Sequence, residues 1–254
     1  MVVTIFQFEI NEDVIGKGKR TVHTQNAKID IISNIDEHPG IEKAEVTILG
    51  PDTEGSRQIA RNELIKVLLT SYGTQARVLR LIGSRQVPDD TRTQPTTVKM
   101  EYIAGAKFVA REGSPGLEIL KVNVNASGKA ETAILQYYEA LTKDHPVDRY
   151  REMFKVIEFL SSPGNVVDGL NKGLWSIPPG ILSEAISKFT PRFVNPGLKL
   201  AVVLVDTRDK WSHLKEGYGS KPSDSNAIEE VKRVLPMLES IAKHSLETNP
   251  TTRI

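Results

Sequence analysis

The sequence predicts an α+β protein in which a β-rich region precedes a helical one. Two features of the apolar residues lead to this prediction. Before residue 128 they form short runs that alternate with polar residues, as on half-buried strands. After Gly128 they recur every three or four positions, as on one face of a helix. We therefore expect a β-rich domain over residues 1–127 and an all-helical domain over residues 128–254.

The first domain is expected to hold several strands and one helix. Residues 4–10 alternate clearly between apolar and polar side chains. Residues 56–72 break this pattern, because Ile59, Leu64 and Leu68 lie near helical spacing. Clusters of Gly, Pro, Asn and Asp separate the apolar runs. On the same grounds we predict strands over residues 28–32, 44–49, 97–103, 107–110 and 117–124, a basic turn over residues 16–20, and a polar loop over residues 86–97.

The second domain is expected to be a helical bundle. One apolar stripe runs from Ala133 to Leu141 and a second from Tyr150 to Leu160, with Pro146 in a turn between them. The apolar run over residues 201–205 would also suit a buried strand, but its helical neighbours favour a helix. The remaining helices are predicted over residues 179–193, 199–214 and 223–245, the last of them kinked at Pro236.

The composition excludes several classes of protein. The chain has no cysteine, which rules out disulfides and cysteine-containing zinc sites. Its 33 basic and 32 acidic residues nearly balance, which argues against a general nucleic-acid coat protein. The first residues do not resemble a signal peptide, and no apolar run approaches the ~18 residues of a membrane span. We therefore expect a cytoplasmic protein that has no membrane partner.

Three patterns that would indicate a bound group or a nucleophile are weak or absent. Residues 50–56 have the two-glycine spacing of a phosphate loop, but Ser56 stands in place of its lysine. Two acidic residues, Asp52 and Glu54, also line that loop. The five histidines lack metal-ligand spacing, and no Gly-x-Ser-x-Gly elbow is present. We therefore expect no cofactor and no metal.

The most specific chemical proposal comes from Arg208, Asp209 and His213. An arginine offers a permanently charged fork of donors for phosphate oxygens, and a histidine can accept or donate a proton near neutral pH. A helix would place Asp209 and His213, four residues apart, on one face. Arg208 and His213 are five apart, about 140° around a helix, so a shared cleft or a distorted helix end would have to bring them together.

Basic residues gather around this motif. Lys199, Lys210 and Lys215 are the side chains that we expect to contact a polyanion such as RNA. Acidic residues are fewer there, with Asp206 and Glu216 beside Asp209. An ordinary solvated surface is the alternative. In that case Asp209 and His213 form a surface pair and Arg208 pairs with Asp206 or Glu216.

This arrangement resembles the HEPN superfamily, the higher eukaryote and prokaryote nucleotide-binding domains. Its hallmark is an arginine, then a polar residue, then a histidine four to six residues after the arginine, which Arg208, Asp209 and His213 match. Residues 135–141 resemble an early helix of such domains, and the motif lies late in the chain with one helix after it. The resemblance covers about residues 128–254. A β-rich region ahead of such a domain resembles bacterial MauJ-like or ApeA-like members.

The resemblance implies a helical bundle that forms a homodimer with the two motifs facing one cleft. Catalytic members are metal-independent endoribonucleases, which occur as toxins and antiphage-defence effectors. It therefore implies RNA as substrate, Arg208, His213 and Asp209 as the catalytic residues, and an antitoxin or defence-system protein as a partner. Other members have lost catalysis. The alternative is therefore an inactive module that binds RNA or protein, or that dimerises.

Overall fold

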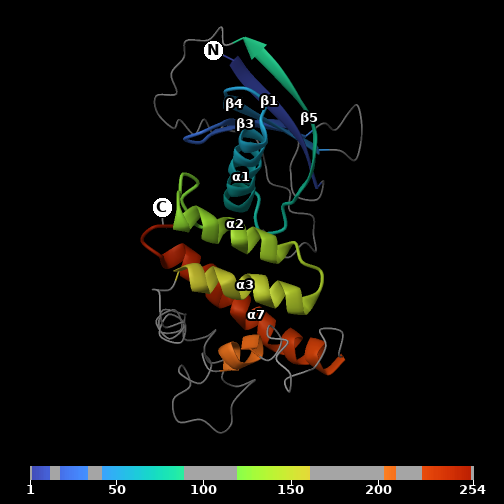
Figure 1. Ribbon diagram of the computed structural model, residues 1–254, viewed down its shortest axis with the longest axis vertical. Helices are drawn as coiled ribbons and strands as arrows, with labels where there is room; N and C mark the ends of the chain where they lie inside the picture. The colour runs from blue at the N-terminus through green and yellow to red at the C-terminus, as the bar shows by residue number, and fades with distance from the viewer. Residues whose placement is uncertain are drawn as a thin grey trace. The chain divides into compact units, whose positions relative to one another are not determined.

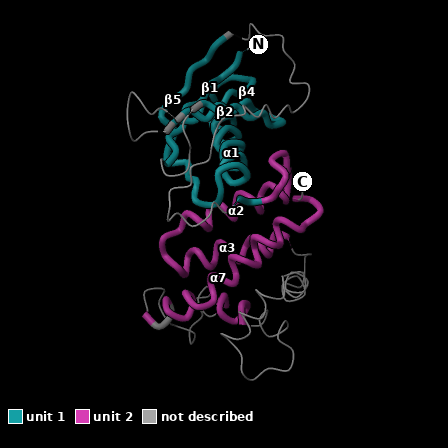
Figure 2. The backbone as a smooth tube through the Cα atoms, turned by 180° about the vertical axis from the view of Figure 1, so that it is seen from behind, with its two compact units in different colours: residues 1–120 teal, residues 121–254 magenta. Residues whose placement is uncertain are grey.

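A computed structural model describes residues 2–11, 18–33, 42–88, 119–160, 203–209 and 225–252 (Figure 1). The chain divides into two compact units, residues 1–120 and residues 121–254 (Figure 2). The boundary expected between residues 127 and 128 lies a short way inside the second unit. Sheet and helix are distributed as expected for an α+β protein, because all the described strands belong to the first unit.

The first unit is built on an antiparallel sheet of five strands in the order β2-β3-β4-β1-β5 (Figure 1). Strand β1, which lies between β4 and β5, alternates between buried and partly exposed residues, which places Phe6, Phe8 and Ile10 in the core. Pairing fixes its register, because Phe6 lies opposite Val46 on β4 and Ser84 on β5. The strands are β1 (Val2–Ile10), β2 (Gly18–His23), β3 (Lys28–Ser33), β4 (Glu42–Leu49) and β5 (Val78–Pro88).

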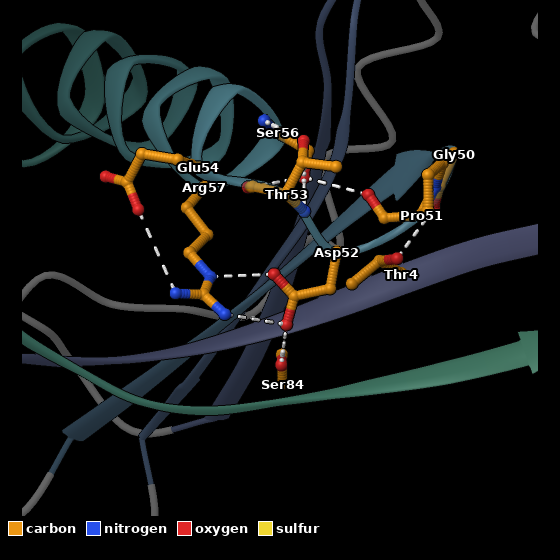
Figure 3. Close-up of polar contacts among 9 residues, drawn as sticks. All are labelled: Thr4, Gly50, Pro51, Asp52, Thr53, Glu54, Ser56, Arg57 and Ser84. Atoms are coloured by element: carbon orange, nitrogen blue, oxygen red, sulfur yellow. Dashed lines mark hydrogen bonds and ion pairs between the residues drawn. The ribbon is translucent and has the colours of Figure 1, made fainter.

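One helix, α1 (Glu54–Ser71), packs against β4 and β5 in the same unit. Its first turn is held by a reciprocal cap: Thr53 Oγ1 accepts from the Ser56 amide, and Ser56 Oγ accepts from the Thr53 amide. Asp52 binds the Arg57 guanidinium through both carboxylate oxygens, and Ser84 Oγ of β5 donates to the same carboxylate (Figure 3). These contacts join the start of α1 to the sheet.

The described residues confirm the strands expected over residues 4–10, 28–32 and 44–49, and the helix expected over residues 56–72. Two other expectations were wrong. Residues 18–20 belong to β2 and not to a turn, and residues 86–88 belong to β5 and not to a loop. The strands expected over residues 97–103 and 107–110 lie outside the described residues.

Both missed strands are the outer strands of the sheet, which explains why the apolar pattern did not reveal them. An outer strand has fewer neighbours, so it need not carry the alternation of a half-buried strand. Leu79, Leu81 and Ile82 of β5 are all exposed. The pairing of β1 with β5 also shifts register twice, between Gln7 and Phe8 and between Glu9 and Ile10, and each shift interrupts the period of two.

The strand expected over residues 117–124 was also wrong where the structure describes it. Leu120 and Val122 are buried, as the alternation suggests, but residues 119–124 form no strand. Their backbone finds partners elsewhere. The Leu120 amide donates to the Leu69 carbonyl in the first unit, and the Asn123 amide donates to the Thr252 carbonyl in the second.

In the second unit, every regular element among the described residues is helical, as expected. Helix α3 (Pro146–Leu160) packs against both α2 (Lys129–Leu141) and α7 (Ser225–Thr248) (Figure 1). Pro146 begins α3 and does not lie in the preceding turn, because the first helical position does not need an amide hydrogen.

The choice of helix over strand was also right for the described end of the 201–205 run. Residues 203–209 are helical, and the helix expected over residues 179–193 lies outside the described residues. None of the helices among the described residues combines the length and apolar character that crossing a membrane requires.

Candidate functional site around Arg208

Two of the six residues singled out from the sequence fall within the described part of the chain. These are Arg208 and Asp209, the last two described residues of a segment that is helical over residues 203–209. The other four, His213, Lys199, Lys210 and Lys215, lie outside the described residues. The site can therefore be built from Arg208 and Asp209 and from the described side chains that contact them.

The Arg208 guanidinium is held by two carboxylates and an aromatic ring. Its Nη1 lies 2.5 Å from Oε1 of Glu158 on α3. Its Nε and Nη2 lie 2.8 and 2.6 Å from Oδ1 of the neighbouring Asp209. The guanidinium carbon lies 4.7 Å from the centre of the Phe154 ring, within range of a cation–π interaction. Three different groups therefore fix the orientation of this side chain.

One face of α3 supplies the partners of the 203–209 segment. Tyr150, Phe154 and Glu158 are spaced four residues apart, which places them along one side of the helix. The rings of Tyr150 and Phe154 stack with centroids 6.4 Å apart. The spacing of the two aromatic residues had predicted a buried stripe. Glu158 continues that stripe by one turn, where the helix reaches solvent.

Tyr150 holds the 203–209 segment one turn before Arg208. Its hydroxyl donates a hydrogen bond of 2.7 Å to the Leu204 carbonyl, one turn before Arg208. Burial raises the pKa of the Tyr150 phenol far above its ordinary value, and the opposing effects of Thr207 and Arg208 are smaller. The phenol therefore stays protonated over the physiological range. Its role here is that of a structural hydrogen-bond donor and not of a general base.

The charges of the cluster do not add up to a ready anion-binding site. One guanidinium faces two carboxylates, so the group of Arg208, Glu158 and Asp209 carries a net charge of about −1 if all three are ionised. All three side chains reach solvent, with exposed fractions of 24%, 37% and 47% respectively. A phosphate that approaches from solvent can therefore reach Arg208, but it has to compete with the two carboxylates that already contact the guanidinium.

Sequence reasoning had suggested Asp206 or Glu216 as the structural partner of Arg208. Among the described residues its partners are Glu158 and Asp209, whereas Glu216 lies outside them. Glu158 was missed because it lies 50 residues away along the chain. The only signal available for it was its place four residues after Phe154 on an apolar stripe.

The loop over residues 50–56, which had the spacing of a phosphate loop, has another role in the structure. The cap formed by Thr53 and Ser56 occupies the start of α1, and Asp52 and Glu54 bring negative charge there (Figure 3). Across the described residues there is also no group of three or more histidine, aspartate or glutamate side chains placed to hold a metal ion.

Comparison with known proteins does not extend these observations: the chain matches no protein-family model, no curated protein and no solved structure. Membership of the HEPN superfamily therefore stays a prediction that depends on Arg208, Asp209 and His213.

Proposed function

We propose that this chain is a metal-independent endoribonuclease of the cytoplasm, a toxin or antiphage-defence effector that acts as a homodimer. The observation that carries the proposal is the placement of Arg208. Its guanidinium is oriented by Phe154 and Asp209, reaches solvent, and lies five residues before His213 in the chain. Catalysis by positioned charge needs an oriented arginine of this kind, because a fixed donor loses little freedom when the substrate binds.

The proposed reaction is the attack of a ribose 2′-hydroxyl on the adjacent phosphorus. The new bond joins the 2′-oxygen to phosphorus, and the bond from phosphorus to the 5′-oxygen breaks. A base takes the hydroxyl proton, and an acid returns a proton to the leaving 5′-oxygen. His213 can serve in either role near neutral pH, and Arg208 holds the charge that builds up on the phosphate oxygens. The products are a 2′,3′-cyclic phosphate and a 5′-hydroxyl, and no metal takes part.

The need for two proton transfers explains why a dimer is part of the proposal. In an in-line displacement the attacking and leaving oxygens lie on opposite sides of the phosphorus. One histidine cannot easily serve both sides at once. A second copy of the chain would supply a second His213, so a single cleft would hold both an acid and a base. Lys199, Lys210 and Lys215 are then the candidates for holding the neighbouring phosphates.

The direct test is cleavage of a fluorescently labelled single-stranded RNA by the purified full chain in excess EDTA. Arg208→Ala and His213→Ala should each abolish cleavage, and Arg208→Lys should fail because a point charge does not replace the fork. Asp209→Ala should weaken cleavage, if its role is to orient Arg208. Matched controls are Arg233→Ala on α7 and His23→Ala on β2, whose side chains are exposed. Cleavage that persists in His213→Ala, or that needs a divalent metal, would refute the mechanism.

One observation favours a second candidate, an inactive module that binds RNA or a protein partner. Arg208 is paired with both Glu158 and Asp209, which is also what a purely structural arginine would show. In that case the wild-type protein would never cut RNA, and the Arg208 variants would only bind their partner less tightly. The cleavage assay separates the two candidates because the second predicts no product at any protein concentration.

A further inference from the structure

The hydrogen-bond donors of Arg208 are divided unequally between its two carboxylate partners. A guanidinium has five N–H groups. Asp209 Oδ1 accepts a hydrogen bond from Nε and lies 2.6 Å from Nη2, while Glu158 Oε1 accepts from Nη1. The edge that carries Nη1 and Nη2 is the one that suits two oxygens of a phosphate. Glu158 therefore contacts one of the two nitrogens of that edge, Nη1.

The two carboxylates also differ in how they are tied to the arginine. Asp209, the next residue in the chain, meets the guanidinium at two nitrogens, Nε and Nη2, whereas Glu158 meets it at one. Glu158 comes from α3, and among the described residues it pairs with Arg208 alone. Its side chain is 37% exposed, so it can rotate into water without being buried elsewhere. Glu158 is therefore the partner that can be exchanged.

The guanidinium would keep its place after such an exchange. Phe154 is fully buried and lies under the guanidinium face, and Asp209 still holds Nε. Replacing one singly charged anion by another also leaves the charge in direct contact with the guanidinium unchanged. An RNA phosphodiester carries one negative charge, as a carboxylate does. The exchange therefore needs no rearrangement of α3 or of the 203–209 segment.

We propose that Glu158 occupies the place on Arg208 that an RNA phosphate takes, and so acts as an internal competitor of the substrate. This inference rests on the proposed function for the nature of the ligand, a phosphodiester of RNA. It adds a restraint to that site. Arg208 engages RNA only when Glu158 releases Nη1, and removing the charge of Glu158 strengthens RNA binding.

The test is binding of a fluorescein-labelled single-stranded RNA in which every 2′-hydroxyl is methylated, so that the probe cannot be cleaved by this route. Fluorescence anisotropy at low salt should show that Glu158→Gln of the full chain binds about threefold to fivefold more tightly than wild type, the upper part of the range for exposed ion pairs. Glutamine keeps the size and an acceptor oxygen of Glu158, so a packing role alone would leave the affinity unchanged.

The matched control is Asp148→Asn, which removes one negative charge from the same helix. Asp148 lies ten residues before Glu158, about 15 Å along α3, and its partners are His145 and Arg151. The control variant should bind like wild type. In an Arg208→Ala background, Glu158→Gln should lose its effect, because no guanidinium remains for it to release. Thermal unfolding of each variant checks the fold, and Glu158→Ser serves as a second variant without the charge.

Several results would overturn the inference. These are an unchanged or weaker affinity in Glu158→Gln, an equal gain in Asp148→Asn, a gain that persists without Arg208, or no measurable binding by either the wild type or Glu158→Gln. The outcome is separate from that of the proposed function. Tighter binding by Glu158→Gln without cleavage of ordinary RNA would support the competitor and refute the nuclease. Cleavage by wild type with no effect of Glu158→Gln would do the reverse.

Discussion

The two units each contain a pairing of a cation with a carboxylate, and the two pairings differ in burial. In the first unit Lys66 Nζ lies 3.0 Å from Glu63 Oε1, and both side chains are only 2% exposed. In the second unit Arg208 and Glu158 lie 2.5 Å apart, with exposed fractions of 24% and 37%. The chemistry of the contacts is similar, but only the second pair can meet a ligand that arrives from solvent.

The comparison shows that accessibility, and not ion pairing itself, separates a structural cation from a candidate binding group. Breaking the Glu63–Lys66 pair leaves a charge where water cannot replace its partner, which is costly. Breaking the Arg208–Glu158 pair returns one carboxylate to water, which costs little. A pair that breaks cheaply can be exchanged during function, whereas a pair that is expensive to break holds the fold.

The largest effect is expected for the buried pair. Lys66→Ala should destabilise the protein by about 3–5 kcal/mol, because Glu63 would lose the charge that compensates its burial. Among the described residues, Asn26 would still donate a hydrogen bond to Glu63 Oε1. Urea unfolding followed by circular dichroism measures the difference. The double variant Glu63→Gln/Lys66→Met should recover most of the loss, since it removes both charges. A loss below about 1 kcal/mol in Lys66→Ala would mean that water reaches the pair, contrary to its burial.

A smaller loss of stability is expected at Arg208. Arg208→Ala should cost about 1–2 kcal/mol, the sum of a partly exposed ion pair and a cation–π contact with Phe154. The same unfolding experiment measures it. A loss as large as that of Lys66→Ala would place Arg208 with the structural cations. That result would favour the inactive module over the nuclease, because the arginine would then be needed for the fold.

Asp30 of β3 pairs with Lys19 and Lys28, and the burial of these ion pairs is intermediate, because the carboxylate is 8% exposed and both lysines reach solvent. The strength of these pairs depends on pH through the ionisation of Asp30. Burial by itself raises the pKa of Asp30, but a hydrogen bond from Thr21 and the charges of Lys28 and Lys19 outweigh it and lower the pKa below 3.8. The ionised carboxylate therefore stabilises the fold above its ordinary pKa, and this contribution is lost as the pH falls through the lowered value. Asp30→Asn should flatten the fall of the urea midpoint as the pH is lowered from about 6 to below 3.8. An unchanged slope would show that Asp30 does not contribute to it.

Much of the fold could be predicted from the sequence, because an element that buries one side carries apolar residues at regular intervals. Strands β1 and β4 and helices α2 and α3 each bury mainly one side, and the apolar residues show it. Strand β3 and helix α1 were also predicted, although α1 buries every residue from Glu63 to Leu69. The outer strands β2 and β5 were missed because that constraint is weaker at the edges of a sheet. The segment around Leu120 has the right alternation, but among the described residues no strand pairs with it, and a pattern within one segment cannot reveal whether a partner strand exists.

The candidate site was predictable only in part. The spacing of Arg208 and Asp209 identified the residues, and helical neighbours placed them on a helix. The second partner of Arg208, Glu158 on α3, was not predictable, because nothing in the sequence distinguishes it from the nearer Asp206 and Glu216. Only the packing of the 203–209 segment on the face of α3 that carries Tyr150 and Phe154 selects Glu158.

The smallest effect on stability is expected for Arg57 near the start of α1, because its side chain is more exposed than those of Lys66 and Arg208. Its side chain is 46% exposed, and salt screens such a pair. Arg57→Ala should therefore shift the unfolding midpoint less than Lys66→Ala or Arg208→Ala. Thr53→Ala, which removes the cap of the same helix, should cost about 1 kcal/mol and provides the scale.

The same variant should still leave a clear local signal at Asp52. Hydrogen bonds from Arg57 and then from Ser84 hold the pKa of the Asp52 carboxyl below its usual value. In Arg57→Ala that pKa should rise toward 3.8 but remain below it, because Ser84 still donates to the carboxylate. An NMR titration of the carboxyl carbon measures the change. No rise would mean that the contact does not persist in solution, and a midpoint shift larger than that of Thr53→Ala would show that exposure alone does not rank these pairs.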